Sequence, residues 1–329
     1  MLAGLLTCPE PTCRLDYPIL DGVPVIVPDL RAYAQERGAE LLLRDDLDPA
    51  VEGLLADAVG PGTWFDGIRQ ILSTYGWDGW ADLDPAELPA AEGGPVPGAA
   101  RRCLARLLAM AHPVQGVRRV LDLGCAAGRT SLDLAAAHPD ALVLGLDLGF
   151  ALLRVARRAA EGEVTYPRRR IGLIHDRRRF AVAPEGVDRA DFWACDALAL
   201  PFAPGVADLA AALNLLDCVP DPRGLLAALA EAVRPGGRAL LATPYDWSAR
   251  ATPPETWIGG HSPRSAHGGA AEPFLRALVE PGAHGRSVPG LHLVAEADMP
   301  WQTRLHDRSS VQYRAHLVAL ARTETHTDD

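Results

Sequence analysis

The sequence contains no lysine, and all 32 of its basic residues are arginine. This absence excludes a Schiff-base or nucleophilic lysine mechanism. The formal charge is −10, so the chain also lacks the basic excess that binds phosphate backbones, and we expect no nucleic-acid partner. No apolar run reaches the roughly 18 residues of a membrane-spanning helix, and the start MLAGLLTC lacks the basic region of a signal peptide. We therefore expect a cytoplasmic protein that does not bind membranes.

Cysteine is also scarce for a chain of this length. The six cysteines are too scattered to indicate a disulfide framework, which favours a reducing compartment. No cluster of Asp, Glu or His has the spacing of a ligand set, so we expect no metal. The 329 residues, 48% of them hydrophobic, are enough for one large α/β domain with additions.

The stretch 118–129, RRVLDLGCAAGR, has the pattern of a strand, a tight turn and a helix. Gly124 allows the chain to turn sharply, and the small residues up to Gly128 let a ligand approach the free N–H groups of the helix. The turn therefore predicts a nucleotide-like cofactor held by Gly124, Cys125, Ala126 and Gly128. Such a turn alone does not separate nicotinamide, flavin and S-adenosylmethionine (SAM) proteins.

Three acidic residues at the ends of successive predicted strands favour SAM. Asp122 precedes the turn and suits the methionyl ammonium, and Asp147, roughly twenty residues after the turn, suits the ribose hydroxyls. Asp196 suits the adenine amine, whereas three acids would repel a pyrophosphate. The alternative is that they are ordinary polar residues at strand ends. The predicted cofactor site also includes Leu148, Ala197 and Asn214.

The order of predicted elements gives the fold class. Strands and helices alternate from residue 98 onward, which predicts an α/β, Rossmann-like, doubly wound and mostly parallel seven-stranded sheet. Residues 291–301 and 311–322 are expected to form its final strand pair. We divide the chain into a ribbon-like segment at 1–30, a helical cap and linker at 31–97, and the main domain at 98–329.

Residues 17–28, YPILDGVPVIVP, predict a hairpin around Asp21 and Gly22. This segment resembles the small zinc-ribbon domain that precedes or partners some methyltransferases. Only Cys8 and Cys13 remain of its two cysteine pairs, while a structural zinc site needs four ligands. We therefore expect a degenerate ribbon without metal. The alternative is a zinc site completed by histidines from elsewhere in the chain.

Two stretches lie outside this pattern of alternating strands and helices. Residues 48–59 and 61–76 have helical periodicity and predict a cap, in which Tyr75 and Trp77 either pack or line a substrate pocket. Residues 163–186 carry arginine triplets at 168–170 and 177–179. We interpret this insertion as a solvated loop, with attraction of an acidic substrate as the alternative.

Four motifs together resemble one family more specifically. LDLGCAAGR, NLLDCVPDP, TPYDWSARATPPETWIGG and ADMPWQTRLHDR are similar to stretches in the methyltransferase portion of ovothiol synthases and related 4-mercaptohistidine N1-methyltransferases. The resemblance covers residues 98–322. It implies a SAM-dependent transfer of a methyl group to a ring nitrogen of a histidine-like small molecule, with S-adenosylhomocysteine as product.

The same resemblance places candidate residues near the methyl acceptor. Methyl transfer to an imidazole nitrogen needs a neutral ring, an aromatic wall and a hydrogen-bond partner on the far nitrogen. The catalytic candidates are Tyr245, Glu255 and His306, and the substrate-binding candidates are Tyr75, Trp77, Trp247 and Trp257. Each has a structural alternative: the aromatic residues pack, and His306 pairs with Asp307.

Two other functions fit the same residues. One is an O-, N- or C-methyltransferase that modifies a natural product, and the other is a SAM-binding subunit that activates a partner without catalysis. The expected partner is a small-molecule substrate, and the expected assembly is a monomer or homodimer.

Overall fold

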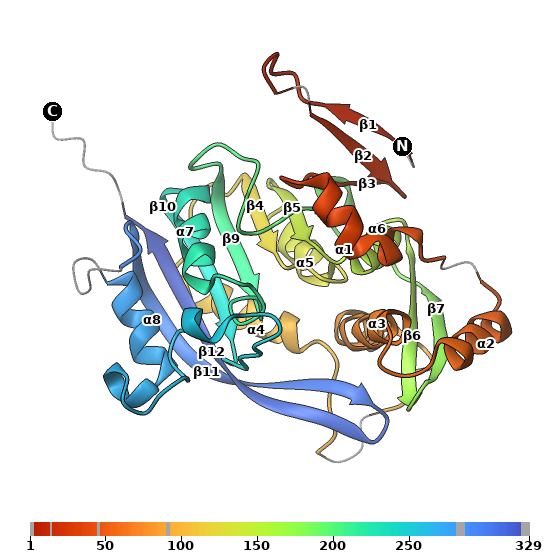
Figure 1. Cartoon of the computed structure of the whole chain (residues 1–329). Helices are drawn as coiled ribbons and strands as arrows, with labels where there is room; N and C mark the ends of the chain where they lie inside the picture. The colour runs from red at the N-terminus through yellow and green to blue at the C-terminus, as the bar shows by residue number, and fades with distance from the viewer. Residues whose placement is uncertain (1–2, 14, 45–46, 90–92, 281–286, 324–329) are drawn as a thin grey trace, which may run out of the picture.

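The computed structural model describes residues 3–13, 15–44, 47–89, 93–280 and 287–323. Its centre is a seven-stranded sheet in the order β11-β12-β10-β9-β4-β5-β8 (Figure 1). β12 pairs antiparallel with β10 and β11, and the pairs from β10 to β8 are parallel. This confirms the predicted Rossmann-like, mostly parallel fold. The strands are β4 (Arg119–Leu123), β5 (Leu142–Asp147), β8 (Ala190–Ala194), β9 (Ala207–Leu213), β10 (Val233–Thr243), β11 (Leu291–His306) and β12 (Ser309–Arg322).

The central strands are apolar because helices cover both faces of the sheet. Every residue of β9 is buried, and its sequence ADLAAAL is almost entirely small or aliphatic. The chain runs from β4 to β5 on one side, and β9 later adds to the other side of β4. The strand order therefore reverses at β4 and β9, and ligands of such sheets bind at the carboxyl ends of the strands beside this reversal.

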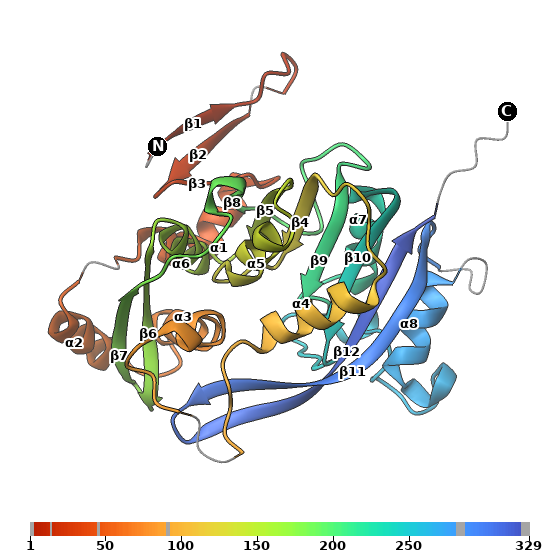
Figure 2. The same cartoon turned by 180° about the vertical axis from the view of Figure 1, so that it is seen from behind.

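Five helices flank the sheet. α4 and α5 pack on one face of the sheet, in a buried cluster with residues of β4, β9 and β12. α7 and α8 pack on the opposite face, in a second buried cluster. Figure 2 shows α4 in front of the face that it covers. Among the described helices, none has the length and apolar run that crossing a bilayer requires. The helices are α4 (Ala99–Met110), α5 (Arg129–Ala137), α6 (Phe150–Ala160), α7 (Pro222–Ala232) and α8 (Ala271–Val279).

A three-stranded antiparallel ribbon precedes the cap: β1 (Ala3–Thr7), β2 (Asp16–Leu20) and β3 (Val23–Pro24). Asp21 and Gly22 both have positive φ, as a two-residue hairpin turn requires, so the predicted hairpin is confirmed. After β3, Val25 bridges to Ala194 of β8, and the N–H of Ile26 donates to the Ala194 carbonyl. The ribbon is thus joined to the edge of the main sheet.

The cap consists of α1 (Leu30–Leu42), α2 (Pro49–Val59) and α3 (Trp64–Trp80), and α3 continues into the 3₁₀-helix η1 (Ala81–Leu83). The helices predicted within 48–59 and 61–76 are therefore confirmed. α3 is tied directly to the predicted cofactor turn, because the indole N–H of Trp80 donates to the carbonyl of Ala127 over 2.9 Å. The guanidinium of Arg129 also lies over the Trp80 ring, 4.8 Å from its centre.

The expectation of a solvated loop at residues 163–186 is wrong. β6 (Glu163–Ile171) and β7 (Ile174–Ala181) form a separate antiparallel hairpin beside α3 (Figure 1). Val164, Tyr166 and Phe180 are buried, whereas arginines occupy much of the rest of both strands. The alternation of Val164 and Tyr166 is the period of two that marks a half-buried strand.

Candidate functional site

The turn after β4 has the geometry that the sequence predicts. Gly124 has φ of 72°, and a Cβ there would lie 3.0 Å from the Leu215 side chain. The N–H groups of Gly124 and Cys125 both donate to the carbonyl of Leu146, which joins the turn to the end of β5. The Cys125 side chain is buried, so this residue can offer only its backbone to a cofactor.

Gly128 is required for packing rather than for ligand access. It has φ of 79° just before α5, and a Cβ there would lie 2.5 Å from Ala156 and 2.7 Å from Phe192. Ala127 is buried as well, and its carbonyl faces Trp80. The part of the turn that a ligand can reach is therefore the segment around Ala126, which is half-buried.

Asp147 ends β5 and braces this turn. Its Oδ2 accepts from the N–H of Ala126 over 2.9 Å, and its Oδ1 accepts from the N–H of Gly149 over 2.7 Å. Burial raises the pKa of the Asp147 carboxyl, although these two N–H groups act in the opposite direction. Next to it, the carbonyl of half-buried Leu148 accepts from the Tyr33 hydroxyl of α1. A carboxylate half-buried beside the turn suits the predicted contact with ribose hydroxyls.

Asp122 lies beneath the turn and is only 1% exposed. Its Oδ2 accepts hydrogen bonds of 2.7 Å from the hydroxyls of Thr130 and Ser131 in the first turn of α5. Burial raises the pKa of Asp122 to about 6, against the opposing effect of these two bonds. The observed role of Asp122 is thus to support the turn, and its contact with a cofactor ammonium stays a prediction.

The third acid lies at the end of β8, and its contact with an adenine amine stays a prediction. Asp196 follows β8, is half-buried, and uses Oδ1 to accept from the N–H of Leu198 over 2.9 Å. Ala197 beside it is buried. Asp122, Asp147 and Asp196 therefore lie at the carboxyl ends of three neighbouring parallel strands, β4, β5 and β8.

Three residues other than glycine adopt left-handed backbone at one edge of the sheet. Ala126, Asn214 and Tyr245 have φ of 48°, 55° and 56°. They follow β4, β9 and β10, which are adjacent strands. Such conformations cost energy in residues with a side chain, most of all in a bulky one, and they concentrate at functional sites. The strain therefore marks the same strand ends as the cofactor prediction.

Aromatic residues gather after β10. The rings of Trp247 and Trp257 are stacked, with centres 6.0 Å apart and planes inclined by 13°. The Tyr245 ring lies 6.2 Å from Trp247, and the Trp257 indole N–H donates to the Thr252 carbonyl. The indole N–H of Trp247 is buried and has no partner among the described residues. Tyr245, Trp247 and Trp257 thus lie together after β10, and their contact with a substrate stays a prediction.

Tyr75 of the cap faces the same region. It is half-buried, and burial raises the pKa of its hydroxyl. Tyr75 packs against the buried cluster that includes Cys125 and Ala127 of the cofactor turn. Tyr75 thus lies beside the turn, and its contact with a substrate stays a prediction.

Trp77, the other aromatic candidate from the cap, is a packing residue. It is 2% exposed, and the guanidinium of Arg304 lies over its ring, 5.8 Å from the centre. Tyr75 and Trp77 are two positions apart, and two positions place side chains on nearly opposite sides of a helix. One of the pair therefore faces the predicted site, and the other faces the hairpin of β11 and β12.

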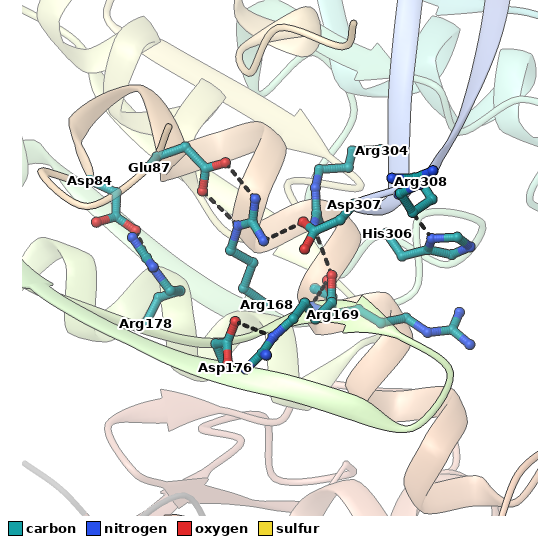
Figure 3. Close-up of polar contacts among 12 residues, drawn as sticks. Asp84, Glu87, Arg168, Arg169, Asp176, Arg178, Arg304, His306, Asp307 and Arg308 are labelled. Carbon is teal, nitrogen blue, oxygen red and sulfur yellow. Dashed lines mark hydrogen bonds and ion pairs between the residues drawn. The ribbon is translucent and has the colours of Figure 1, made fainter. Parts of the chain in front are cut away.

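The catalytic candidates Glu255 and His306 do not join the aromatic group. Glu255 is exposed on the 3₁₀-helix η3 (Pro254–Thr256). His306 ends β11 at the tip of the long hairpin, where its Nδ1 accepts from the backbone N–H of Arg308 over 3.2 Å (Figure 3). The sequence-based alternative for His306, a pair with Asp307, is not formed, because Asp307 pairs with Arg168 and Arg304 instead.

Sequence reasoning missed His316, Glu296 and Asp217. The hydroxyl of Tyr245 lies 2.8 Å from Nδ1 of His316, and Nε2 of His316 lies 3.1 Å from Oε2 of Glu296. Asp217 is buried and accepts from the backbone N–H of Asp246 over 2.6 Å. The signal for His316 was present, since it is the one ionisable side chain within the apolar run of residues 315–321.

Five of the six arginines in the two triplets form ion pairs, and Nε of the sixth, Arg169, donates to the carbonyl of Gly172. Arg168 pairs with both oxygens of Glu87 and with Asp307, and Arg178 pairs with Asp84 (Figure 3). Arg177 pairs with Glu52, Arg170 with Asp176, and Arg179 with Glu163. Arg168, Arg177 and Arg178 therefore hold the β6–β7 hairpin to the cap, to the residues after η1 and to the β11–β12 hairpin. The pairs of Arg170 and Arg179 lie within the hairpin, so most of the charge of the triplets is paired and little is left to attract an acidic substrate.

Comparisons with known proteins agree with this geometry. Residues 121–241 match the family described as a methyltransferase domain. Malonyl-acyl-carrier protein O-methyltransferase of Legionella pneumophila is 51% identical over 41 residues, which are 12% of this chain and 14% of that protein. Ubiquinone biosynthesis O-methyltransferase of Erwinia tasmaniensis is 33% identical over 127 residues, which are 38% of this chain and 42% of that protein.

A solved structure extends the similarity of fold beyond the matched domain. The crystal structure of the cyclase SpnF aligns with a TM-score of 0.50 at 15% identity, over 83% of this chain and 97% of that one. The chain spans less than half the length of the two curated relatives. For the domain at 121–241, the comparisons confirm the predicted enzyme class, a SAM-dependent methyltransferase, and the predicted cofactor, SAM.

Proposed function

We propose that the protein transfers a methyl group from SAM to a small molecule, and that the acceptor is a ring nitrogen of a histidine-like or thiol-histidine imidazole. The observation that carries the proposal is the meeting of two groups at one sheet edge. The turn braced by Asp147 follows β4, and the aromatic group around Tyr245 follows β10, with only β9 between these strands.

The residues at the turn fit the cofactor. Asp147 and Asp196 are half-buried carboxylates, each with one or both oxygens already oriented by backbone N–H groups, and such oriented acceptors suit ribose hydroxyls and an adenine amine. We assign them these roles and assign Asp122 to the methionyl ammonium. The sulfonium of SAM supplies an electrophilic methyl group, so the protein needs chiefly to align the acceptor and keep water out.

On the acceptor side, we assign Tyr245, Trp247 and Trp257 as the wall against which an imidazole ring lies, with Tyr75 closing the site from the cap. Stacked indoles bind a flat ring through its face. Glu255 and His306 are left out because one is exposed on η3 and the other lies at a hairpin tip. We further propose a cytoplasmic protein, monomeric or homodimeric, that binds neither nucleic acid nor membranes.

A second candidate is O-methylation of a natural product or other small molecule. It is favoured by the two curated relatives described above, both of which are O-methyltransferases by name. Both candidates use the same cofactor site and differ in the acceptor. A SAM-binding subunit without catalytic activity is a third possibility, against which the assembly of Asp122, Asp147 and Asp196 at adjacent strand ends argues.

The test has two steps. Calorimetry in the presence of chelator measures the binding of SAM and S-adenosylhomocysteine, and absence of binding at millimolar concentration would refute the proposal. Methyl-labelled SAM is then incubated with small imidazoles, including 4-mercaptohistidine, and with phenols and carboxylic acids. Mass spectrometry of the product identifies the methylated atom. Label on oxygen would favour the second candidate, and label on a ring nitrogen the first.

A further inference from the structure

Four side chains form a hydrogen-bonded chain that starts at Tyr245. The Tyr245 hydroxyl lies 2.8 Å from Nδ1 of His316, and Nε2 of His316 lies 3.1 Å from Oε2 of Glu296. Nε of Arg276 in turn lies 2.9 Å from each oxygen of Glu296. The four residues come from the loop after β10, from β12, from β11 and from α8. The chain thus connects a strand end at the proposed site to the surface of the domain.

The chemistry of the partners decides the direction of each hydrogen bond. The Glu296 carboxylate only accepts, and the pKa of Glu296 is held below its usual range, first by the hydrogen bond from Arg276. In the neutral form of His316, Nε2 therefore carries the proton and Nδ1 is an acceptor. The Tyr245 hydroxyl must then donate to Nδ1. Burial raises the pKa of Tyr245, so the phenol keeps its proton.

The surroundings hold this arrangement in place. His316 is 4% exposed, and its ring lies 5.9 Å from the Tyr245 ring. On its other side, Tyr245 lies against Trp247, which is stacked on Trp257. The Tyr245 backbone is in the left-handed region, and its N–H donates to the Thr243 hydroxyl over 3.1 Å. A strained backbone that is held this closely indicates a side chain whose position matters.

We propose that His316, oriented by Glu296 and Arg276, is a positioning residue that accepts the hydrogen bond of the Tyr245 hydroxyl. Because that proton points at His316, Tyr245 offers only an oxygen lone pair to the methyl acceptor. Tyr245 would then bind an N–H or O–H donor of the acceptor and discriminate against acceptors without one. This inference rests on the proposed function, because it places the acceptor beside Tyr245. Within the imidazole class, it favours a ring that keeps N–H on one nitrogen while the other nitrogen attacks.

The test compares two probes that differ in one donor. Imidazole has an N–H, and 1-methylimidazole does not. Binding of each to the protein saturated with S-adenosylhomocysteine is measured by calorimetry at pH 8. We expect wild type to bind imidazole about tenfold more tightly, the equivalent of one hydrogen bond. The preference should vanish in Tyr245→Phe and His316→Phe.

Conservative and control variants separate positioning from folding. His316→Asn places an amide oxygen near the position of Nδ1 and should keep part of the preference. His292→Asn on β11 and Tyr17→Phe in the ribbon remove a histidine and a phenol elsewhere and should bind as wild type. Nitrogen NMR of His316, assigned by its loss in His316→Asn, should report a proton on Nε2 and none on Nδ1 at pH 8.

Two failures can be told apart. If the protein does not bind S-adenosylhomocysteine, the proposed function fails. If it binds S-adenosylhomocysteine but shows no binding of imidazole, no preference between the probes, or an unchanged preference in His316→Phe, then only the present inference is overturned.

Discussion

Arg168 and Asp307 are 139 positions apart in the chain, yet Nη1 of Arg168 lies 2.6 Å from Oδ1 of Asp307. The same guanidinium contacts both oxygens of Glu87, and the same carboxylate accepts from Arg304 (Figure 3). This cluster of ion pairs therefore joins three segments: the β6–β7 hairpin, the residues after η1 and the tip of the β11–β12 hairpin. Because β6 and β11 both contact α3, the cluster helps to hold the cap against the sheet domain.

Arg168→Gln should lower the free energy of unfolding by about 2 kcal/mol, because it leaves Glu87 and Asp307 without their shared cation in a largely buried site. Arg170→Gln is the matched control. Arg170 pairs with Asp176 within one exposed hairpin, so its loss should cost less than about 0.5 kcal/mol. Urea unfolding measures both. Equal values for the two variants would mean that the pair with Asp307 does not hold the cap.

The contribution of Asp122 to the stability of the cofactor-free protein should fall as pH rises from about 4 to about 6. The pKa of Asp122 is raised to about 6 in the fold, so the folded state binds its proton more tightly than the unfolded chain does. This contribution is complete below pH 4 and lost above pH 6, a difference of roughly 3 kcal/mol. Asp122→Asn should therefore stabilise the protein at pH 8 and have little effect at pH 4. Thermal unfolding of both proteins across this range is the measurement, and a pH-independent difference would contradict the assignment.

Gly128→Ala should lower the free energy of unfolding by about 2–4 kcal/mol. Its Cβ would overlap Ala156 and Phe192, and its φ of 79° is unfavourable for alanine. Gly53→Ala is the control, because that glycine is within α2 and has open space around it, and it should stabilise the protein by about 0.5–1 kcal/mol. Urea unfolding again compares them. A tolerated alanine at 128 would show that the helix α5 can shift away from Phe192.

Local patterns were enough to predict most of the fold. The apolar strands before Gly124 and Asp147 and the helices between them each have a period that is visible in the sequence, and the order of elements then selects the sheet. The β6–β7 hairpin was missed because arginine triplets obscured the alternation of Val164 and Tyr166. What keeps those arginines on a strand is a set of acids far away in the chain, such as Glu87 and Asp307, and no local window contains them.

The candidate site, like the fold, could be predicted from the sequence only in part. The acids of the cofactor turn follow strands directly, so their meeting at one edge could be predicted from topology. The partners of Tyr245 could not, because His316 and Glu296 reach it across the antiparallel strands β12 and β11, and their register is not evident from either strand alone. Glu255 and His306 were placed by resemblance of motifs, which carries no information about whether a side chain faces solvent.

The N-terminal ribbon should contain no stoichiometric zinc. Cys8 and Cys13 are both free and half-exposed, and no group of three or more potential ligands is present in the part of the chain that the structure describes. A structural zinc site needs four ligands, so one cysteine pair is not sufficient. Elemental analysis of protein purified without chelator is the measurement. One zinc per chain, lost in Cys8→Ser, would show that ligands from elsewhere complete the site.

The last prediction separates cofactor binding from methyl transfer. Asp147→Ala removes the acceptor proposed for two ribose hydroxyls and should weaken SAM binding by about 1.5–3 kcal/mol, or roughly 10- to 150-fold. The loss includes the bracing of the turn, because the N–H groups of Ala126 and Gly149 lose their acceptor. Asp147→Asn keeps an acceptor oxygen but not the charge, and should fall between wild type and Asp147→Ala.

Tyr245→Phe should leave SAM affinity nearly unchanged and lower the single-turnover rate, because a misaligned acceptor slows the methyl-transfer step without changing cofactor binding. Glu255→Gln is the control for this arm, since Glu255 is exposed on η3 and should transfer methyl at the wild-type rate. SAM dissociation constants and single-turnover rates are measured on all four variants. If Asp147→Ala binds SAM normally, the cofactor does not lie on the turn. If Tyr245→Phe turns over normally while Glu255→Gln is slow, the acceptor lies beside η3 and not against the aromatic wall.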